Sequence, residues 1–261
     1  MHIHIVSIFP DIFKSFIETS LIKKAQEKKI LTFTFTNPRT FCPDRHQTVD
    51  DTIYGWGAGL LMKAKPAIDA VEHIIKTKKL MASLIKEEAT VLSESLRISA
   101  DADGGFGKRK KPRFAIILPS PSKDTFTQKT AHALSDTQHI IFVCTRYEGI
   151  DYRFEQYMKK KYPKQFQKIS LWQFITLGGE VPAMIMIEAI TRLIPWVIKE
   201  EASRQDESYS VAQNMNNLEY PQYTKPDEVL GMKIPKILVS GHHANIKARR
   251  EKKTKKIKIK K

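Results

Sequence analysis

The chain has 261 residues, of which 41% are hydrophobic and 9% aromatic, an ordinary composition for a globular protein with room for two modest domains. It contains no run of about eighteen apolar residues, which excludes a membrane-spanning helix. Its two cysteines, Cys42 and Cys144, lie far apart, which argues against a disulfide framework or a zinc site and suits a reducing cytoplasm.

The net charge of +16 arises from 44 Lys and Arg against 28 Asp and Glu, and it points to a polyanionic partner. Residues 247–261 hold ten basic residues and one acidic residue, so this segment supplies nine of the sixteen net positive charges. A segment of this kind is either a disordered, solubilising tail or a nucleic-acid contact, and both readings stay open on charge alone.

The first eighty residues alternate between strand and helix patterns. Residues 4–8 form an apolar run typical of a buried strand, and we expect a first strand here instead of a cleaved leader. Residues 12–28 show the helical spacing of apolar side chains, residues 31–36 alternate like a second strand, and residues 67–79 are again helical.

The middle of the chain continues this alternation after an interruption. Residues 80–113 combine mixed helical patches with a basic run, so we interpret them as an insertion on the surface. Strands follow at 114–118 and 139–144 with a helix at 127–135 between them, and an apolar helix covers 181–193. Strands that alternate with helices predict an α/β domain with a mainly parallel sheet, covered on both faces.

The pattern divides the chain into four parts. Residues 1–198 form the α/β domain, and residues 199–217 are polar with little periodicity, as expected of a flexible linker. Residues 218–247 predict a small helical domain, and residues 248–261 form a basic tail.

Four segments carry residue types that a structural core does not require. They are residues 50–59, 118–121, 144–151 and 177–183. The first is dense in glycine, which permits positive φ and close backbone approach, although an ordinary loop explains it equally well. The other three follow strands or open a helix, where open α/β sheets place ligands, so they are expected to converge on one pocket. Taken singly, the charged turn at 144–151 is either a salt-bridged loop or a polar ligand site.

The order and content of these motifs resemble those of the bacterial tRNA (guanine-N1)-methyltransferase family, which belongs to the knotted (SPOUT) methyltransferase superfamily. The resemblance covers most of residues 1–80 and 114–250. The matching segments are residues 8–13, 50–55, 146–151, 178–184, 192–195, 219–226 and 238–243. The resemblance implies an α/β domain with a deep trefoil knot and a small helical C-terminal domain that binds tRNA. It also implies a cytoplasmic homodimer whose active sites are shared between subunits.

The resemblance implies that the methyl donor, S-adenosyl-L-methionine, is held in a bent shape inside the knot. The residues that align with donor-site positions are Leu118, Pro119, Ser120, Pro121, Thr145, Arg146, Glu148, Leu171, Trp172, Gln173, Phe174, Ile175, Thr176, Gly178, Gly179 and Pro182. The residues themselves indicate no metal ligand set, whereas the resemblance implies that Mg2+ takes part.

The resemblance also implies that the methyl group goes to N1 of guanosine at position 37 of tRNA, next to the anticodon. Glu207 aligns with the general base and Arg192 with the catalytic arginine. The chemistry is coherent, because N1 becomes nucleophilic only when it loses its proton and an arginine near O6 stabilises the resulting negative charge. Asp206 is an alternative base, and an ion pair with Glu188 is an alternative role for Arg192.

Several positions depart from the family pattern. Thr145 stands where the family has Gly, Gln173 and Phe174 replace Asp and Tyr, and Glu207 is one methylene longer than the family's Asp. Two alternative functions therefore stay open: a catalytically inactive knotted protein that still binds RNA, and a knotted methyltransferase with another RNA substrate.

The three tryptophans, Trp56, Trp172 and Trp196, all stand where the family has glycine. Because glycine occupies about 7% of positions in proteins, three independent coincidences have odds on the order of one in 3000. We therefore hypothesise that these codons are UGA and that the organism reads them as glycine. The alternative is three genuine tryptophans in a donor site that has lost its activity.

Overall fold

The computed structural model describes residues 1–81, 114–198, 207–210 and 217–256. The chain divides into two compact units, Met1–Ile198 and Lys199–Lys261, which are described separately. Nearly all of the predicted insertion at 80–113 and most of the predicted linker at 199–217 lie outside the described residues.

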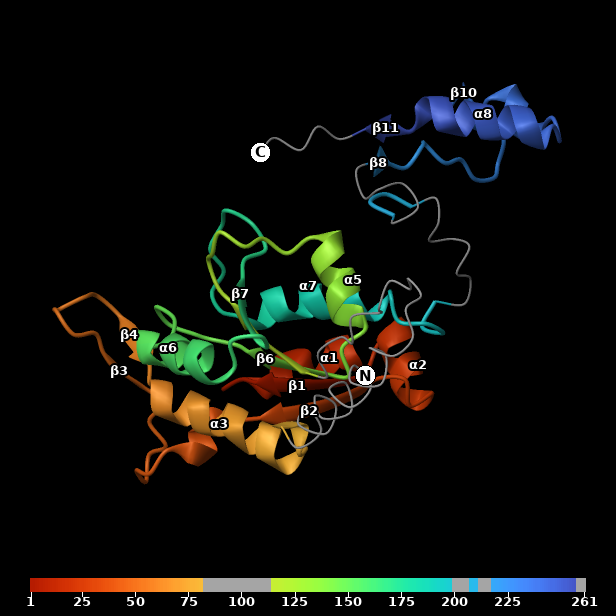
Figure 1. Ribbon diagram of the computed structural model, residues 1–261. Coiled ribbons are helices and arrows are strands. Elements are labelled where there is room, and N and C mark those ends of the chain that lie inside the picture. The colour runs from red at the N-terminus through yellow and green to blue at the C-terminus, as the bar shows by residue number, and fades with distance from the viewer. Residues whose placement is uncertain (82–113, 199–206, 211–216, 257–261) are drawn as a thin grey trace, which may run out of the picture. The chain divides into compact units, whose positions relative to one another are not determined.

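The first unit is built on a five-stranded sheet in which all neighbouring strands are parallel (Figure 1). Its strands are β1 (His2–Val6), β2 (Thr32–Thr36), β5 (Phe114–Pro119), β6 (His139–Val143) and β7 (Phe166–Ile169). They lie in the order β2-β1-β6-β5-β7. The predicted α/β class with a mainly parallel sheet is confirmed.

Successive residues of the central strands pack into different cores, because side chains of a strand alternate between its two faces. In β6, Ile140 and Phe142 belong to one buried cluster, whereas Ile141 and Val143 belong to the other. The strands therefore read as continuous apolar runs, which is typical of a parallel sheet covered on both sides.

Helices cover both faces of the sheet (Figure 1). The first cluster takes in residues of α2 (Ser20–Glu27), α5 (Gln128–Ser135) and α7 (Glu180–Thr191). The second cluster takes in residues of α3 (Ala64–Thr77) and α6 (Tyr152–Lys161). A short hairpin of β3 (Asp50–Thr52) and β4 (Leu60–Met62) extends from this unit.

The single helix predicted over residues 12–28 is wrong, because the segment is divided into three pieces. They are a 3-10 helix η1 (Pro10–Phe13), α1 (Lys14–Ile17) and α2. Thr19 interrupts the helix with extended backbone, and its hydroxyl donates a hydrogen bond of 2.5 Å to the carbonyl of Ser15. Threonine competes in this way for backbone acceptors, which is why the apolar spacing did not reveal the break.

The described residues of the second unit form short strands and helices. The strands are β8 (Asn217–Leu218), β9 (Glu228–Val229), β10 (Met232–Lys233) and β11 (Lys255–Lys256). The helices are the 3-10 helix η5 (Lys236–Val239) and α8 (His243–Lys253). The predicted boundary between domain and basic tail at residue 247 is wrong, since it falls inside α8.

Three histidines form a stacked cluster at the amino-terminal ends of β1 and β6. The Nε2 atom of His4 lies 3.0 Å from Nδ1 of His139, and the rings of His2 and His139 stack with centroids 4.7 Å apart. The Nδ1 atom of His4 also lies 2.6 Å from the hydroxyl of Thr34. Burial, with the neighbouring histidines and Lys78, lowers the pKa of His4 to about 3 and that of His139 to about 4.

This cluster makes the stability of the first unit sensitive to mild acid. The folded protein keeps these imidazoles neutral, whereas the unfolded chain binds protons near their ordinary pKa of about 6.5. We expect the free energy of unfolding to fall as pH decreases from about 7 to 5, and to fall less steeply in His4→Leu. Urea unfolding at several pH values measures this slope. The matched control is His73→Leu, which removes an exposed histidine of α3; equal slopes in both variants would contradict the prediction.

Candidate functional site

The loops after β5, β6 and β7 meet the start of α7 around a cavity of about 320 Å³. Its lining residues are Pro119, Ser120, Pro121, Thr145, Tyr147, Glu148, Gly149, Ile169, Ser170, Leu171, Phe174, Ile175, Thr176, Gly178, Gly179 and Pro182. The cavity lies at the carboxyl ends of parallel strands, which is where open α/β sheets bind their ligands.

Twelve of the sixteen predicted donor-site residues line this cavity, and four do not. Leu118 is buried within β5. Trp172 and Gln173 line a neighbouring cavity of about 530 Å³, which shares Pro121, Ser170, Phe174 and Ile175 with the first. The guanidinium of Arg146 is paired with Glu180 and is not among the lining residues.

Four lining residues were not among the predicted donor contacts. Tyr147 and Gly149 belong to the charged turn that the motif analysis singled out, so the signal for them was present. Ile169 and Ser170 lie at the end of β7, which the apolar pattern did not reveal. Burial, together with Asp50, raises the pKa of the Tyr147 phenol, so this lining hydroxyl is neutral.

The wall of the cavity at the start of α7 requires glycine. A Cβ atom at Gly179 would lie 2.9 Å from both Cα of Cys144 and the backbone nitrogen of Thr145. The amide of Gly179 donates a hydrogen bond of 2.8 Å to the carbonyl of Thr145, which ties the two loops together. Burial raises the pKa of the Cys144 thiol beneath this contact, so the sulfur stays protonated.

The hairpin of β3 and β4 contacts the turn at 146–151 through backbone hydrogen bonds. The amide of Glu148 donates to the carbonyl of Leu60, and the amide of Met62 donates to the carbonyl of Gly149, each over 3.0 Å. Gly59 has φ +89°, and a Cβ atom there would lie 2.8 Å from Cγ of Glu148. The glycine-rich segment at 50–59 is therefore part of the cavity's support.

The two predicted catalytic residues belong to different units. Arg192 directly follows α7, half-buried, and its amide donates to the carbonyl of Glu188 over 3.2 Å. Glu207 lies in the second unit, and its carbonyl accepts a hydrogen bond of 3.2 Å from the amide of Ser210. The alternative base Asp206 lies outside the described residues.

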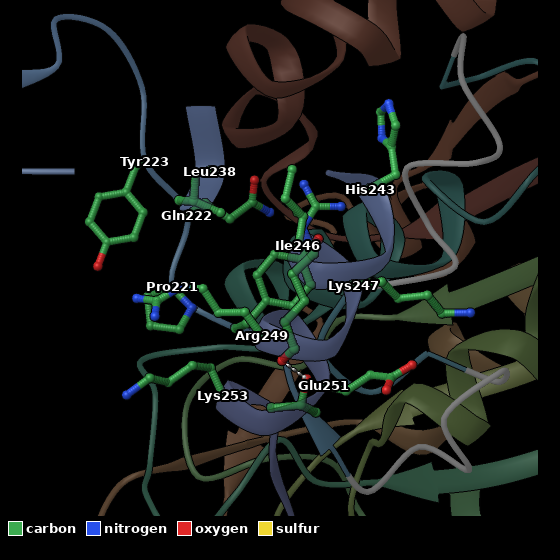
Figure 2. Close-up of a pocket in the computed structure, with 13 residues that line it drawn as sticks. Pro221, Gln222, Tyr223, Leu238, His243, Ile246, Lys247, Arg249, Glu251 and Lys253 are labelled. Carbon is green, nitrogen blue, oxygen red and sulfur yellow. Dashed lines mark hydrogen bonds between the residues drawn. The ribbon is translucent and has the colours of Figure 1, made fainter. Parts of the chain in front are cut away.

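The second unit has a basic cavity of its own, of about 640 Å³, between α8 and the segment 220–223 (Figure 2). The basic side chains that line it are His243, Lys247, Arg249, Arg250 and Lys253. The guanidinium of Arg250 lies 4.9 Å from the ring centre of Tyr220. Basic groups interleaved with aromatic rings are typical of surfaces that bind nucleic acids.

No helix among the described residues is long and apolar enough to cross a bilayer. Within the same residues, no group of three or more His, Cys, Asp or Glu side chains could hold a metal ion. We therefore assign no residue to Mg2+.

The cavity at the strand ends and its glycine wall define a ligand-binding α/β domain, and comparison with known proteins identifies its family. The family model for tRNA (Guanine-1)-methyltransferase TrmD matches residues 1–96 and 104–261. The chain belongs to this family, which confirms the resemblance seen in the motifs.

Individual relatives agree with this assignment. A protein called tRNA (guanine-N(1)-)-methyltransferase from Bacillus pumilus is 36% identical over 97% of this chain and 86% of the relative. One of the same name from Dictyoglomus turgidum is 37% identical over 97% and 84%, and one from Kocuria rhizophila is 35% identical over 94% and 80%.

The contact between α7 and β6 can be tested by adding one methyl group. We expect Gly179→Ala to destabilise the protein by about 1–3 kcal/mol, because the new Cβ atom meets backbone that must shift. Gly57→Ala is the matched control, since the atoms nearest to its Cβ would belong to the side chain of Ile53, the first at 3.1 Å. Urea unfolding compares the two variants, and an equal effect on both would contradict the importance of this contact.

Proposed function

We propose that this protein transfers the methyl group of S-adenosyl-L-methionine to N1 of guanosine at position 37 of tRNA. The observation that carries the proposal is the cavity at the ends of β5, β6 and β7, which gathers twelve residues aligned with donor-site positions. The family's name and the names of the relatives support the same reaction. We further propose that the protein works in the cytoplasm.

The cavity suits the methyl donor in two ways. Gly178 and Gly179 let the turn before α7 pack directly against Arg146, Glu180 and the backbone of Cys144 and Thr145, so that its backbone forms the wall of the cavity. The start of α7 carries the positive end of the helix dipole, which favours a carboxylate such as that of the donor's methionine portion. When bound, S-adenosyl-L-methionine supplies an electrophilic methyl group on a sulfonium, and the sulfur leaves as a neutral thioether.

The protein's own chemistry is then proton removal and charge stabilisation. In our proposal, the carboxylate of Glu207 accepts the N1 proton of guanine, and the N1 lone pair forms the new bond to carbon. The guanidinium of Arg192 stabilises the negative charge that develops on O6. No metal is needed to activate the methyl group, since the sulfonium is already a good leaving group.

We propose a homodimer with shared active sites and a knotted α/β domain, as the family resemblance implies. Helix α7 supports the dimer, because it carries apolar residues on its exposed side as well as on its buried side. Ala183, Met186 and Ile187 are buried in the core, whereas Val181 and Ile185 on the other side are 53% and 47% exposed. An apolar helix face of this kind is typical of a surface that another chain covers.

We propose that the second unit binds the RNA through α8 and its basic cavity. The aromatic ring of Tyr223, half exposed at the cavity, is available for stacking, and the cations of α8 suit phosphates. The basic residues between 247 and 256 belong to helix α8 and strand β11. For this part of the basic segment 247–261, the regular structure favours nucleic-acid contact over a disordered tail.

The backbone favours glycine at two of the three tryptophans. Trp56 has φ +55° and Trp196 has φ +69°, both in the left-handed region where bulky residues are strained. Trp172 is 64% exposed and lines the cavity next to the donor site. We therefore retain the proposal that all three codons are read as glycine, with the inactive RNA-binding protein as the rival if they are not.

The catalytic assignment is tested by methyl transfer from labelled donor to a tRNA transcript. We expect Glu207→Ala to abolish transfer with donor affinity nearly unchanged, because the carboxylate acts on guanine. We expect Arg192→Ala to lower kcat by about two orders of magnitude, as for the loss of one stabiliser of developing charge. Arg153→Ala is the matched control, since Arg153 is an exposed arginine paired with Asp151.

Two results would contradict this assignment. Full activity in Glu207→Ala, with loss of activity in Asp206→Ala, would place the base one residue earlier. A loss below about tenfold in Arg192→Ala would return Arg192 to an ion pair with Glu188.

The glycine proposal is tested by comparing the protein as written with a variant in which Trp56, Trp172 and Trp196 are replaced by glycine. We expect the variant to bind S-adenosyl-L-methionine more tightly and to transfer methyl groups, because Trp172 lines the cavity next to the donor site and the left-handed backbone at residues 56 and 196 strains a bulky residue. Peptide masses from the native organism distinguish glycine from tryptophan directly. Tryptophan at all three positions in native peptides would end the recoding proposal, and a variant that still fails to bind the donor would favour the inactive rival.

A further inference from the structure

A completely buried carboxylate lies directly behind the glycine wall of the cavity. Glu180, the first residue of α7, is 0% exposed. Its Oε1 accepts a hydrogen bond of 2.7 Å from the hydroxyl of Ser7, just after β1. Its Oε2 lies 2.9 Å from Nε of Arg146, just after β6, in an ion pair whose angles are not those of a hydrogen bond.

Burial of a charge is costly unless the charge is paired. Here Arg146 and Ser7 are the partners that compensate the buried carboxylate of Glu180. The guanidinium of Arg146 is fixed from two sides, by Glu180 and by the ring of Phe9, whose centre lies 5.0 Å away. The hydroxyl of Ser7 also accepts a hydrogen bond of 3.0 Å from the amide of Phe9. The carboxylate therefore ties the ends of β1 and β6 to the start of α7.

This network is in contact with the cavity wall itself. A Cβ atom at Gly178 would lie 2.6 Å from Cδ and Nε of Arg146 and 2.7 Å from Oε2 of Glu180. Gly178 lines the cavity, whereas Glu180 and Arg146 are absent from its lining. The backbone of the turn at 178–179 consequently rests on the ion pair, with no side chain between them.

We propose that Glu180 is a positioning residue for the methyl donor: through Arg146 and Ser7 it holds the turn at 178–179 in the shape that the donor binds. This proposal rests on the proposed function, since it concerns the same cavity. Without the negative charge, Arg146 loses its partner and can move into the space beside Gly178. The backbone amides at the start of α7 then lose their fixed positions, which weakens donor binding before it changes the chemistry on guanine.

The chain contains a matched control for a merely structural ion pair. Glu155 in α6 is also buried, at 7% exposure, and its carboxylate pairs with Lys159 at 2.5 Å and Lys168 at 3.2 Å. It lies outside the lining of the donor cavity. Glu155→Gln and Glu180→Gln both remove one buried negative charge, so they separate loss of stability from loss of donor binding.

The experiment measures the dissociation constant of labelled S-adenosyl-L-methionine by equilibrium dialysis, alongside KM for the donor, kcat and the melting temperature. The full chain is used in the form that binds the donor, with either tryptophan or glycine at residues 56, 172 and 196. We expect Glu180→Gln to weaken donor binding by about tenfold or more and to raise KM more than it lowers kcat, in line with one lost charge-assisted contact. Ser7→Ala, which removes the hydroxyl's hydrogen bonds with Glu180 and Phe9 but leaves the carboxylate in place, should weaken binding by about threefold, and Glu155→Gln should leave it unchanged.

The outcomes are distinguishable. Donor binding within about twofold of the unmodified protein in Glu180→Gln, or equal weakening in Glu155→Gln, overturns the positioning role. If Glu180→Gln does not fold, Ser7→Ala decides, and unchanged donor binding in that variant overturns the proposal. Absence of donor binding in the unmodified protein in both forms overturns the proposed function, and this inference with it.

Discussion

The start of α7 lies so close to the end of β6 that residue 179 has no space for a side chain. A Cβ atom there would lie 2.9 Å from the backbone of Cys144 and Thr145, and the amide of Gly179 donates to the carbonyl of Thr145 over 2.8 Å. This contact aligns the turn before α7 with the loop after β6, and the loops after β5 and β7 close the remaining sides of the cavity. The parallel order of the strands makes this possible, because it brings their carboxyl ends to one edge.

Behind the same contact, the buried carboxylate of Glu180 pairs with the partly buried guanidinium of Arg146. Charged groups in the interior fix each other's direction, because each loses much of its stabilisation when the other moves. Arg146 was expected to contact the donor, and in the structure it lies behind Gly178 and outside the lining of the cavity. In our proposal it acts one layer away from the ligand, through backbone that carries no side chain.

The sequence predicted the elements with strong apolar patterns and missed those without them. The central strands β1, β5 and β6 read as buried runs, whereas β7 has two half-buried residues between two buried ones, and α6 carries five charges among its ten residues. The resemblance identified most of the residues that line the cavity, because it rests on motifs of glycine and charged residues. The apolar pattern could not do so, since a strand of four residues such as β7 is too short to predict. The resemblance did not supply the role of Glu180, since a buried carboxylate and an exposed one look alike in a sequence.

The central claim is that the methyl donor binds at the carboxyl ends of β5, β6 and β7. Hydrogen–deuterium exchange of the full chain, with and without S-adenosyl-L-methionine, tests it most directly. We predict slower exchange of the backbone amides at 145–149 and 170–179 when the donor is present, and no change in β2 on the far edge of the sheet. Unchanged exchange in both loops at saturating donor, or protection confined to other parts of the chain, would contradict the claim.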